Sequence, residues 1–333
     1  MKLTTIEQVQ KTVGKLPAPR DLKVIDYIDE HAKRWLSYAR FAFIALGKAG
    51  RIKLSAAGGE EGFVSASDPK HLLIPLTALE TENTVEIDSS FGALFIVSGM
   101  DETLRVNGKV SGITDGLLTL RVEECYLHCA KAFRRSSFWE PQSQEKSHDE
   151  ISRFVKQSKF LGLASINNSG QADVSPKGDL ENFLIQEEDG FIGLADRPGN
   201  RRIDSFRNII EQQAVSIIAM VPGCNDILEL QGTAELFTDE HLLQQFTVQG
   251  KEPTVVTKIT PTSMRIKPSI ALANSALWPA KIAPKDLAPS EIFKAHIKLS
   301  KVKSLQAKIA RAVVSLPGAV ERGLKSDYKN NMY

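Results

Sequence analysis

The feature that most constrains the fold of this chain is an internal repeat. Residues 96–110 (IVSGMDETLRVNGKV) resemble residues 220–234 (MVPGCNDILELQGTA), and Gly99 and Gly223 mark the shared register. Two further pairs recur in the same order: AGRIKLSAAGG (49–59) with SGQADVSPKGD (169–179), and AFRRSSFWEP (132–141) with ALANSALWPA (271–280). Three collinear blocks indicate a tandem duplication, so we expect two copies of one structural unit.

Each copy has the same order of local patterns. A helical pattern comes first, over 21–39 in one copy and 147–158 in the other, and short β-rich runs separated by Gly and Asn turns follow. Five to seven short strands at close spacing predict a mainly β fold in which each copy is a small antiparallel barrel. We expect barrels over 15–143 and 146–282, joined near residue 145 by the polar linker EPQSQEK, and a basic helical tail over 286–333.

Composition excludes several classes of protein. No apolar run reaches the roughly 18 to 20 residues that span a bilayer, and the three cysteines with no apolar leader favour a cytoplasmic protein without structural disulfides. The net charge is +2, but residues 281–333 hold eleven Lys and Arg against four Asp and Glu. The other residues therefore sum to 2 − 7 = −5, and a mildly acidic body disfavours nucleic acid as a partner.

One short segment concentrates positive charge. Residues 195–209 (ADRPGNRRIDSFRNI) follow an apolar run, turn at Pro198–Gly199 and enter a helical pattern, so Arg201 and Arg202 are expected at a helix start. Free backbone N–H groups and the helix dipole suit an anion there, and guanidinium groups match phosphate oxygens. The alternative is that these arginines pair with nearby acids such as Asp196 and Asp204.

Several of these motifs resemble one known family. DVSPKGD (173–179), LADRPGNRRIDSFRNI (194–209) and VSIIAMVPG (215–223), with ETLRVNG (102–108) and YLHCAKAFRRSSFW (126–139), are similar to pyridoxamine 5'-phosphate oxidase-like flavoproteins with the FMN-binding split-barrel fold. The resemblance covers roughly 15–280 and implies a pseudo-dimer of two split barrels with FMN at their interface. The cofactor-binding residues it implies are Ser175, Lys177, Arg197, Asn200, Arg201, Arg202 and Ser205 from the second copy, and Lys131, Arg134, Arg135, Ser136 and Trp139 from the first.

The two copies have diverged in complementary ways. Ala57 replaces Lys177 in the first copy, and the acidic run LTALETENTVEIDSS stands where the arginine segment would be. In the second copy the basic residues Lys131, Arg134 and Arg135 are replaced by Ile270, Ala273 and Asn274. Each copy keeps one half of a phosphate site, so we expect one FMN per chain and not two.

Two other patterns have plainer interpretations. Cys125 and Cys129 would share one face of a strand with His128 on the other, so thiols in a core or interface are expected rather than a metal site. Residues 290–316 predict one amphipathic helix capped by Ser290, with a stripe of Ile292, His296, Leu299, Val302, Leu305, Ile309 and Val313. This helix is expected to pack on the barrels or across a dimer, and binding to anionic lipid or nucleic acid is the alternative.

The function expected from the resemblance is a flavin-dependent oxidoreductase acting on a small organic substrate, with NAD(P)H as a candidate electron donor. No residue is identified as catalytic, and no metal site is expected. The alternatives are a non-catalytic flavin or tetrapyrrole binding or sensor protein, and a structural interaction protein with emptied barrels. Whether two chains associate into a further homodimer is open.

Overall fold

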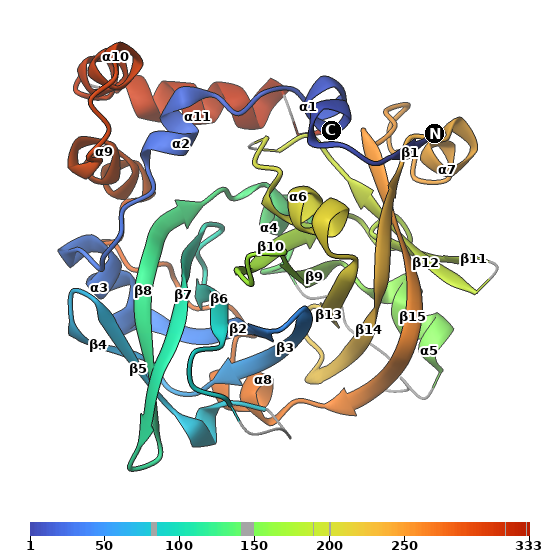
Figure 1. Cartoon of the computed structure of the whole chain (residues 1–333), viewed down its shortest axis with the longest axis horizontal. Coiled ribbons are helices and arrows are strands. Elements are labelled where there is room, and N and C mark those ends of the chain that lie inside the picture. Colours follow the sequence, from blue (N-terminus) through green and yellow to red (C-terminus); the bar gives the residue numbers. More distant parts are fainter. Residues whose placement is uncertain (81–84, 141–149, 189, 200, 317, 331) are drawn as a thin grey trace.

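The computed structural model describes residues 1–333 except 81–84, 141–149, 189, 200, 317 and 331. Two curled antiparallel sheets lie side by side, and Figure 1 shows one built from the blue to green part of the chain and the other from the green to orange part. The predicted mainly β fold, with two tandem barrels and a helical tail, is confirmed. The predicted domain limits at 143 and 146 lie outside the described residues.

The first sheet follows the order β3-β2-β6-β7-β8-β5-β4. Its strands are β2 (Ala39–Lys48), β3 (Arg51–Gly58), β4 (Ser65–Asp68), β5 (His71–Pro75), β6 (Ser90–Val97), β7 (Thr103–Thr114) and β8 (Leu117–His128).

The second sheet follows the order β10-β9-β13-β14-β15-β12-β11, which is the same path with each strand replaced by its counterpart. Its strands are β9 (Phe160–Ile166), β10 (Ala172–Gly178), β11 (Ile185–Glu188), β12 (Phe191–Asp196), β13 (Ala214–Met220), β14 (Asp226–Phe237) and β15 (Val255–Pro268). An added strand, β1 (Lys2–Leu3), pairs with β14. The identical order in both sheets is the arrangement that a tandem duplication predicts.

Short helices join and flank the sheets: α1 (Ile6–Val13), α2 (Ala18–Leu22), α3 (Glu30–Tyr38), the 3-10 turn η1 (Leu76–Ala78), α4 (Lys131–Ser136), α5 (Ile151–Gln157), α6 (Asp204–Glu211), α7 (Glu240–Gln244) and α8 (Ile270–Ser275). The tail forms α9 (Pro289–Leu299), α10 (Leu305–Val314) and α11 (Ala319–Asn330).

Two predicted helices are wrong in extent. The pattern over 21–39 is interrupted, because the backbone of Ile25 exchanges hydrogen bonds of 3.1 and 2.7 Å with Cys125 of β8 and cannot be helical there. The tail pattern over 290–316 breaks after Leu299, and Ser304 caps a new helix by accepting from Ala307 N at 3.1 Å. Ala288 is the N-cap of α9, so the predicted cap at Ser290 is also wrong.

Three apolar clusters form the core. One fills the first barrel, one fills the second, and a third lies between the barrels. Strand β2 serves two of them, because side chains alternate across a strand: Ala42 and Ile44 point into the first barrel, whereas Phe41 and Phe43 point to the interface. The barrels are therefore joined by a continuous buried core and not by a surface contact.

The interface depends on two equivalent glycines. A Cβ atom on Gly178 of β10 would lie 2.0 Å from the carbonyl oxygen of Ala132 in α4, and a Cβ on Gly58 of β3 would lie 2.1 Å from that of Ala271 in α8. In each pair, the helix belongs to one barrel and the strand belongs to the other. This exchange relates the barrels as the two members of a dimer would be related, with α4 on β10 and α8 on β3.

We expect Gly58→Ala and Gly178→Ala each to lower the free energy of unfolding by about 1 to 3 kcal/mol, because the helix backbone must retreat from the strand. Urea unfolding followed by circular dichroism measures the effect. Gly112→Ala is the matched control, since a Cβ at Gly112 meets nothing closer than 3.9 Å. If Gly178→Ala is as stable as Gly112→Ala, the close approach is not what fixes the interface.

Candidate functional site

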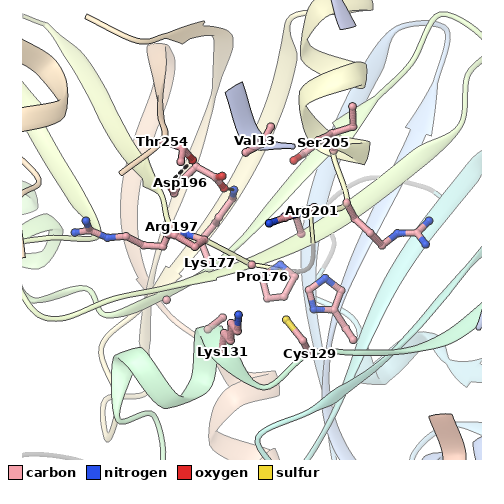
Figure 2. Close-up of a pocket in the computed structure, with 18 of the residues that line it drawn as sticks. Val13, Cys129, Lys131, Pro176, Lys177, Asp196, Arg197, Arg201, Ser205 and Thr254 are labelled. Carbon is pink, nitrogen blue, oxygen red and sulfur yellow. Dashed lines mark hydrogen bonds and ion pairs between the residues drawn. The ribbon is translucent and has the colours of Figure 1, made fainter. Parts of the chain in front are cut away.

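A cavity of about 520 Å³ lies where the two barrels meet around α4 and β10. The first barrel contributes the end of β8 and the start of α4, and the second contributes β10, β12 and the segment that leads into α6. Figure 2 shows Lys131 and Cys129 on one side of this space and Arg201 and Ser205 on the other. Val13 of α1 and Asp327 of α11 complete the lining.

Eight of the residues named from the sequence line this one cavity. Six come from the second barrel and two from the first: Ser175, Lys177, Arg197, Arg201, Arg202, Ser205, Lys131 and Arg135. The volume lies within the usual range for small-molecule sites, about 300 to 1,000 Å³. Segments that are about 70 residues apart in sequence, from Lys131 to Arg201, therefore supply one set of cations.

Three of the named residues do not line the cavity. Arg134 points to Asp101, with Nε 2.9 Å from Oδ2, and lies over the ring of Tyr328. Ser136 is buried and donates to the carbonyl of Phe133 at 2.9 Å, and Trp139 Nε1 donates to the carbonyl of Met100 at 3.0 Å. These three residues stabilise α4 and its surroundings. Asn200 lies outside the described residues.

The basic residues of the first barrel, Lys131, Arg134 and Arg135, lie on a helix that follows the end of a strand. Strand β8 stops at His128, and Lys131 begins α4, which ends in a left-handed residue at Ser137. Helix α8 of the second barrel is its counterpart and ends in the same way at Ala276.

The arginine segment also differs from the expectation of a helix start at Arg201. Strand β12 ends at Asp196, and α6 begins only at Asp204, so Arg201 and Arg202 lie in the connecting turn. Arg201 adopts φ = +60°, a left-handed conformation that cannot belong to a right-handed helix, so α6 cannot extend back to this residue. No side chain caps the N-terminus of α6, and Ser205 in its first turn lines the cavity. Among the described residues, no side chain accepts a hydrogen bond from the N–H groups at this end of α6, so these donors are available to an anion.

Lys177 and Arg197 form ion pairs with acids of their own barrel. Lys177 Nζ forms an ion pair with Asp196 and lies 5.0 Å from the ring centre of Phe206. Arg197 is buried, with Nε 2.5 Å from Asp179 Oδ2 and Nη2 donating to the carbonyl of Phe246 at 2.6 Å. These pairs fix the strand ends of the second barrel. Two residues that the sequence assigned to cofactor binding therefore have a structural role.

Arg202 belongs to a buried network that sequence reasoning missed. Its Nε is 2.9 Å from Asp204 Oδ2, and its guanidinium lies 4.6 Å from the ring centre of Tyr126. The same tyrosine accepts from Arg105 Nη1 at 2.8 Å, and that nitrogen lies 2.9 Å from Asp173 Oδ1. Arg105 and Tyr126 come from the first barrel, whereas the acids come from the second, so the network ties the barrels together.

A signal for this network was present in the sequence. Arg105 stands within ETLRVNG, where neighbours on both sides are buried, and only 1% of its surface is exposed. A charged residue inside such a strand needs a partner. The expectation that arginines pair with Asp196 and Asp204 is partly met: Arg202 pairs with Asp204, whereas the partner of Asp196 is Lys177 and not an arginine.

Arg201 differs from its neighbours because it is exposed. Within the described residues, no acid lies within ion-pair distance of its guanidinium, and its side chain packs beside Gly14. It therefore offers the cavity a cation without an internal counter-ion.

The C-terminal segment supplies contacts to the first barrel's cations. Asp327 Oδ2 lies 3.0 Å from Lys131 Nζ, and Arg135 donates to the carbonyl of Met332. Tyr333 stacks near Arg135 and Arg197, and its hydroxyl donates to Asp179 at 3.2 Å. Burial lowers the pKa of Lys131, and the adjacent Asp327 opposes that shift. A carboxylate from the tail thus stands beside the cation that a bound anion would meet.

His128 and Cys129 form the wall near α4. Burial, with the cations Arg105, Lys23 and Arg202 nearby, holds the pKa of His128 well below its usual value, so its ring is neutral. Its Nδ1 has no hydrogen-bond partner. Cys129 follows the end of β8 and reaches the cavity with His128, whereas Cys125 points into the first barrel's core, so the expected shared face of the two cysteines is wrong. Among the described residues there is no cluster of metal ligands.

At the pseudo-symmetric position on the other side of the molecule, a carboxylate of the chain bonds to the start of a helix. Glu80, from the acidic run of the first copy, accepts from Ser269 Oγ at 2.7 Å and from Ala271 N at 2.6 Å, at the start of α8. Lys267 Nζ lies 3.4 Å from its other oxygen. A carboxylate of the chain itself therefore occupies the helix N-terminus equivalent to that of α4.

The fold and the cationic cavity define an intrachain pair of split barrels with a cavity between them. Residues 147–267 match the family model described as pyridoxamine 5'-phosphate oxidase. The match covers most of the second barrel, and the resemblance to pyridoxamine 5'-phosphate oxidase-like proteins inferred from the motifs is confirmed. No curated protein matches the chain.

Solved structures of several bacterial proteins match part of the chain. General stress protein 26 from Bacillus anthracis is 16% identical, covering 35% of this chain and 91% of that one, with a TM-score of 0.29. HupZ from group A Streptococcus is 16% identical, with coverage of 38% and 97% and a TM-score of 0.30. HutZ, a heme storage protein from Vibrio cholerae, is 14% identical, with coverage of 36% and 93% and a TM-score of 0.26. Such values say nothing about ligand or activity.

We expect Arg105→Ala to lower the free energy of unfolding by about 3 to 5 kcal/mol, because it leaves Asp173 buried without its cation. Chemical unfolding in urea measures the loss. Arg51→Ala is the matched control: its guanidinium is exposed and 4.0 Å from Glu86, so a change within about 0.5 kcal/mol is expected. Equal effects of the two substitutions would contradict a structural role for the network.

Proposed function

We propose that this protein is an FMN-binding flavoprotein with one composite FMN site per chain, acting as a flavin-dependent oxidoreductase on a small organic substrate. The observation that carries the proposal is the cavity between α4 and the arginine segment, where cations of both barrels meet beside the uncapped start of α6. The match of residues 147–267 to the pyridoxamine 5'-phosphate oxidase family supports a flavin as the ligand.

The residues fit a phosphate-bearing cofactor, although fewer of them are available than the sequence suggested. Arg201 and Ser205 are the candidates to bind the phosphate, because neither side chain forms a hydrogen bond or ion pair with another described residue. Lys131 and Arg135 lie on the facing wall, where Asp327 and Met332 now hold them. Arg202, Arg197 and Lys177 would act by holding the loop and strand ends in place.

Bound FMN would supply hydride transfer, and the chain would bind and orient it and the substrate. Ser175 and the neutral ring of His128 line the cavity and can donate or accept hydrogen bonds. NAD(P)H is the proposed electron donor. The cysteine usage of the sequence supports the proposal of a cytoplasmic location. No helix in the described part of the chain is long and apolar enough to cross a membrane.

One site per chain is proposed because the equivalent position in the other half is filled. Glu80 bonds to the start of α8, and Ile270 replaces the lysine that begins α4. An anion would meet like charge there.

We expect the purified protein to be yellow and to release about one FMN per chain on denaturation. Arg201→Ala should weaken FMN binding at least tenfold, since a hydrogen bond to a charged group contributes about 1.5 to 3 kcal/mol. Fluorescence titration of the apoprotein measures the dissociation constant. Arg51→Ala, an exposed arginine of the first barrel, should bind FMN as the unchanged protein does. Undiminished FMN binding by Arg201→Ala would refute the phosphate assignment.

Catalysis is tested separately. We expect NADH or NADPH to bleach the flavin absorbance under anaerobic conditions and air to restore it. A protein that holds FMN but is not reduced by either nucleotide would support a carrier or sensor instead.

A second candidate is a non-catalytic tetrapyrrole carrier, which one observation favours. His128 lines the cavity with a neutral ring and an unpartnered Nδ1, and a neutral imidazole nitrogen is a usual iron ligand. Titration with hemin distinguishes the two: a Soret band that is lost in His128→Ala, with no FMN bound, would replace the first proposal by the second.

A further inference from the structure

The tail helices form a separate layer beside the first barrel. Figure 1 shows α9 and α10 at one edge of the molecule next to α2, with α11 running from there towards the C-terminus. Their inner faces make a small apolar cluster of Leu22, Ile297, Ala307, Ala310, Val314 and Val320. The predicted single stripe is therefore divided: Ile292 and His296 are buried, whereas the later members of the stripe are not.

The outer side of this layer is unusually apolar. Among the described residues, thirteen large apolar side chains are strongly exposed, and six of them fall between residues 299 and 316. They are 41 to 73% exposed: Leu299, Val302, Leu305, Ile309, Val313 and Leu316. Three of them, Leu305, Ile309 and Val313, are spaced by four residues and share one face of α10, opposite the buried alanines. Exposed apolar side chains gathered in this way mark an interaction surface.

The same stretch is strongly basic. From 298 to 325 the chain carries seven cations and one acid, Glu321. The cations are Lys298, Lys301, Lys303, Lys308, Arg311, Arg322 and Lys325. Lys303 and Lys308 flank the apolar face of α10 and are exposed, and in the described part of the chain no acid lies within ion-pair distance of either. Lys301 pairs with Asp26 at 3.0 Å, so the surface combines apolar side chains with the charge of Lys303 and Lys308, which no described acid neutralises.

We propose that this surface, formed by residues 298–316, docks the protein peripherally on an anionic phospholipid membrane. A helix lying in the interface buries its apolar face at the boundary of headgroups and acyl chains, while flanking lysines meet the lipid phosphates. Leu305, Ile309 and Val313 would enter that boundary, with Lys303 and Lys308 at headgroup level. Each lysine near an anionic surface adds to the attraction, which falls off within a Debye length.

Charge decides against two other occupants. A second copy of the chain docking through the same surface would bring the lysines of both copies together around the apolar side chains. Nucleic acid would satisfy the lysines, but its phosphate backbone offers nothing to six exposed aliphatic side chains. Anionic lipid is the partner that complements both components of the surface.

The test is co-sedimentation of the full-length protein with vesicles of phosphatidylcholine alone, and of phosphatidylcholine mixed with phosphatidylglycerol. We expect binding to the mixed vesicles only, and release as the salt concentration rises. The double variant Leu305→Ser with Ile309→Ser, and the double variant Lys303→Glu with Lys308→Glu, should each lower the partition coefficient at least tenfold. Circular dichroism and urea unfolding confirm that each variant is folded.

The matched control is Ile113→Ser with Leu117→Ser. These residues are also exposed apolar side chains, at the tip of the β7–β8 hairpin of the first barrel, and their replacement should leave vesicle binding unchanged. Equal binding to neutral vesicles, or no binding to either kind, would overturn the proposal. So would retention by duplex DNA with no vesicle binding, or a dimer in light scattering that the Leu305→Ser, Ile309→Ser variant abolishes.

Discussion

The close approach of a helix of each barrel to a glycine of the other is the contact on which the rest of this structure depends. With no side chain at Gly178, the backbone of α4 lies directly on β10. Lys131 at the start of α4 and Arg135 near its end thereby reach the strand and turn of the second barrel. Neither barrel contains the cavity alone, because its two walls belong to different halves of the chain.

Charge within the interface is largely matched before any ligand arrives. Arg105 and Arg202 share Tyr126, Asp173 and Asp204 in a buried network, and the tail brings Asp327 to Lys131. Buried charges that are paired and hydrogen-bonded hold one relative position of the elements that carry them. The cavity is consequently a preformed space whose walls are fixed by internal ion pairs, with Arg201 as its exposed cation.

Sequence patterns predicted the architecture well because the same order of motifs and strands occurs twice in the chain. The strand runs, the two copies and the segments that meet at the cavity all follow from residue order and from the resemblance. What failed depends on contacts that no local pattern records. The helix over 21–39 gives way where Ile25 pairs with Cys125, a hundred residues further along the chain. Arg134 and Arg135 are adjacent arginines that look equivalent in the sequence. Their positions on the short helix α4 differ, so Arg134 contacts Asp101 whereas Arg135 lines the cavity. The contacts of Asp327 and Met332 with the first barrel's cations could not be predicted, because no recognisable motif marks the C-terminal segment.

The closure of one pseudo-symmetric position by Glu80 changes what the pair of barrels can do. Two identical chains related by a twofold axis would carry two equivalent pockets, and occupancy of one could alter the affinity of the other. Under the proposed function, a fused chain with one FMN site would have no equivalent site within it to influence. Saturation of that site in a single chain would follow a simple hyperbola, and its two walls would be free to diverge because neither has to serve twice.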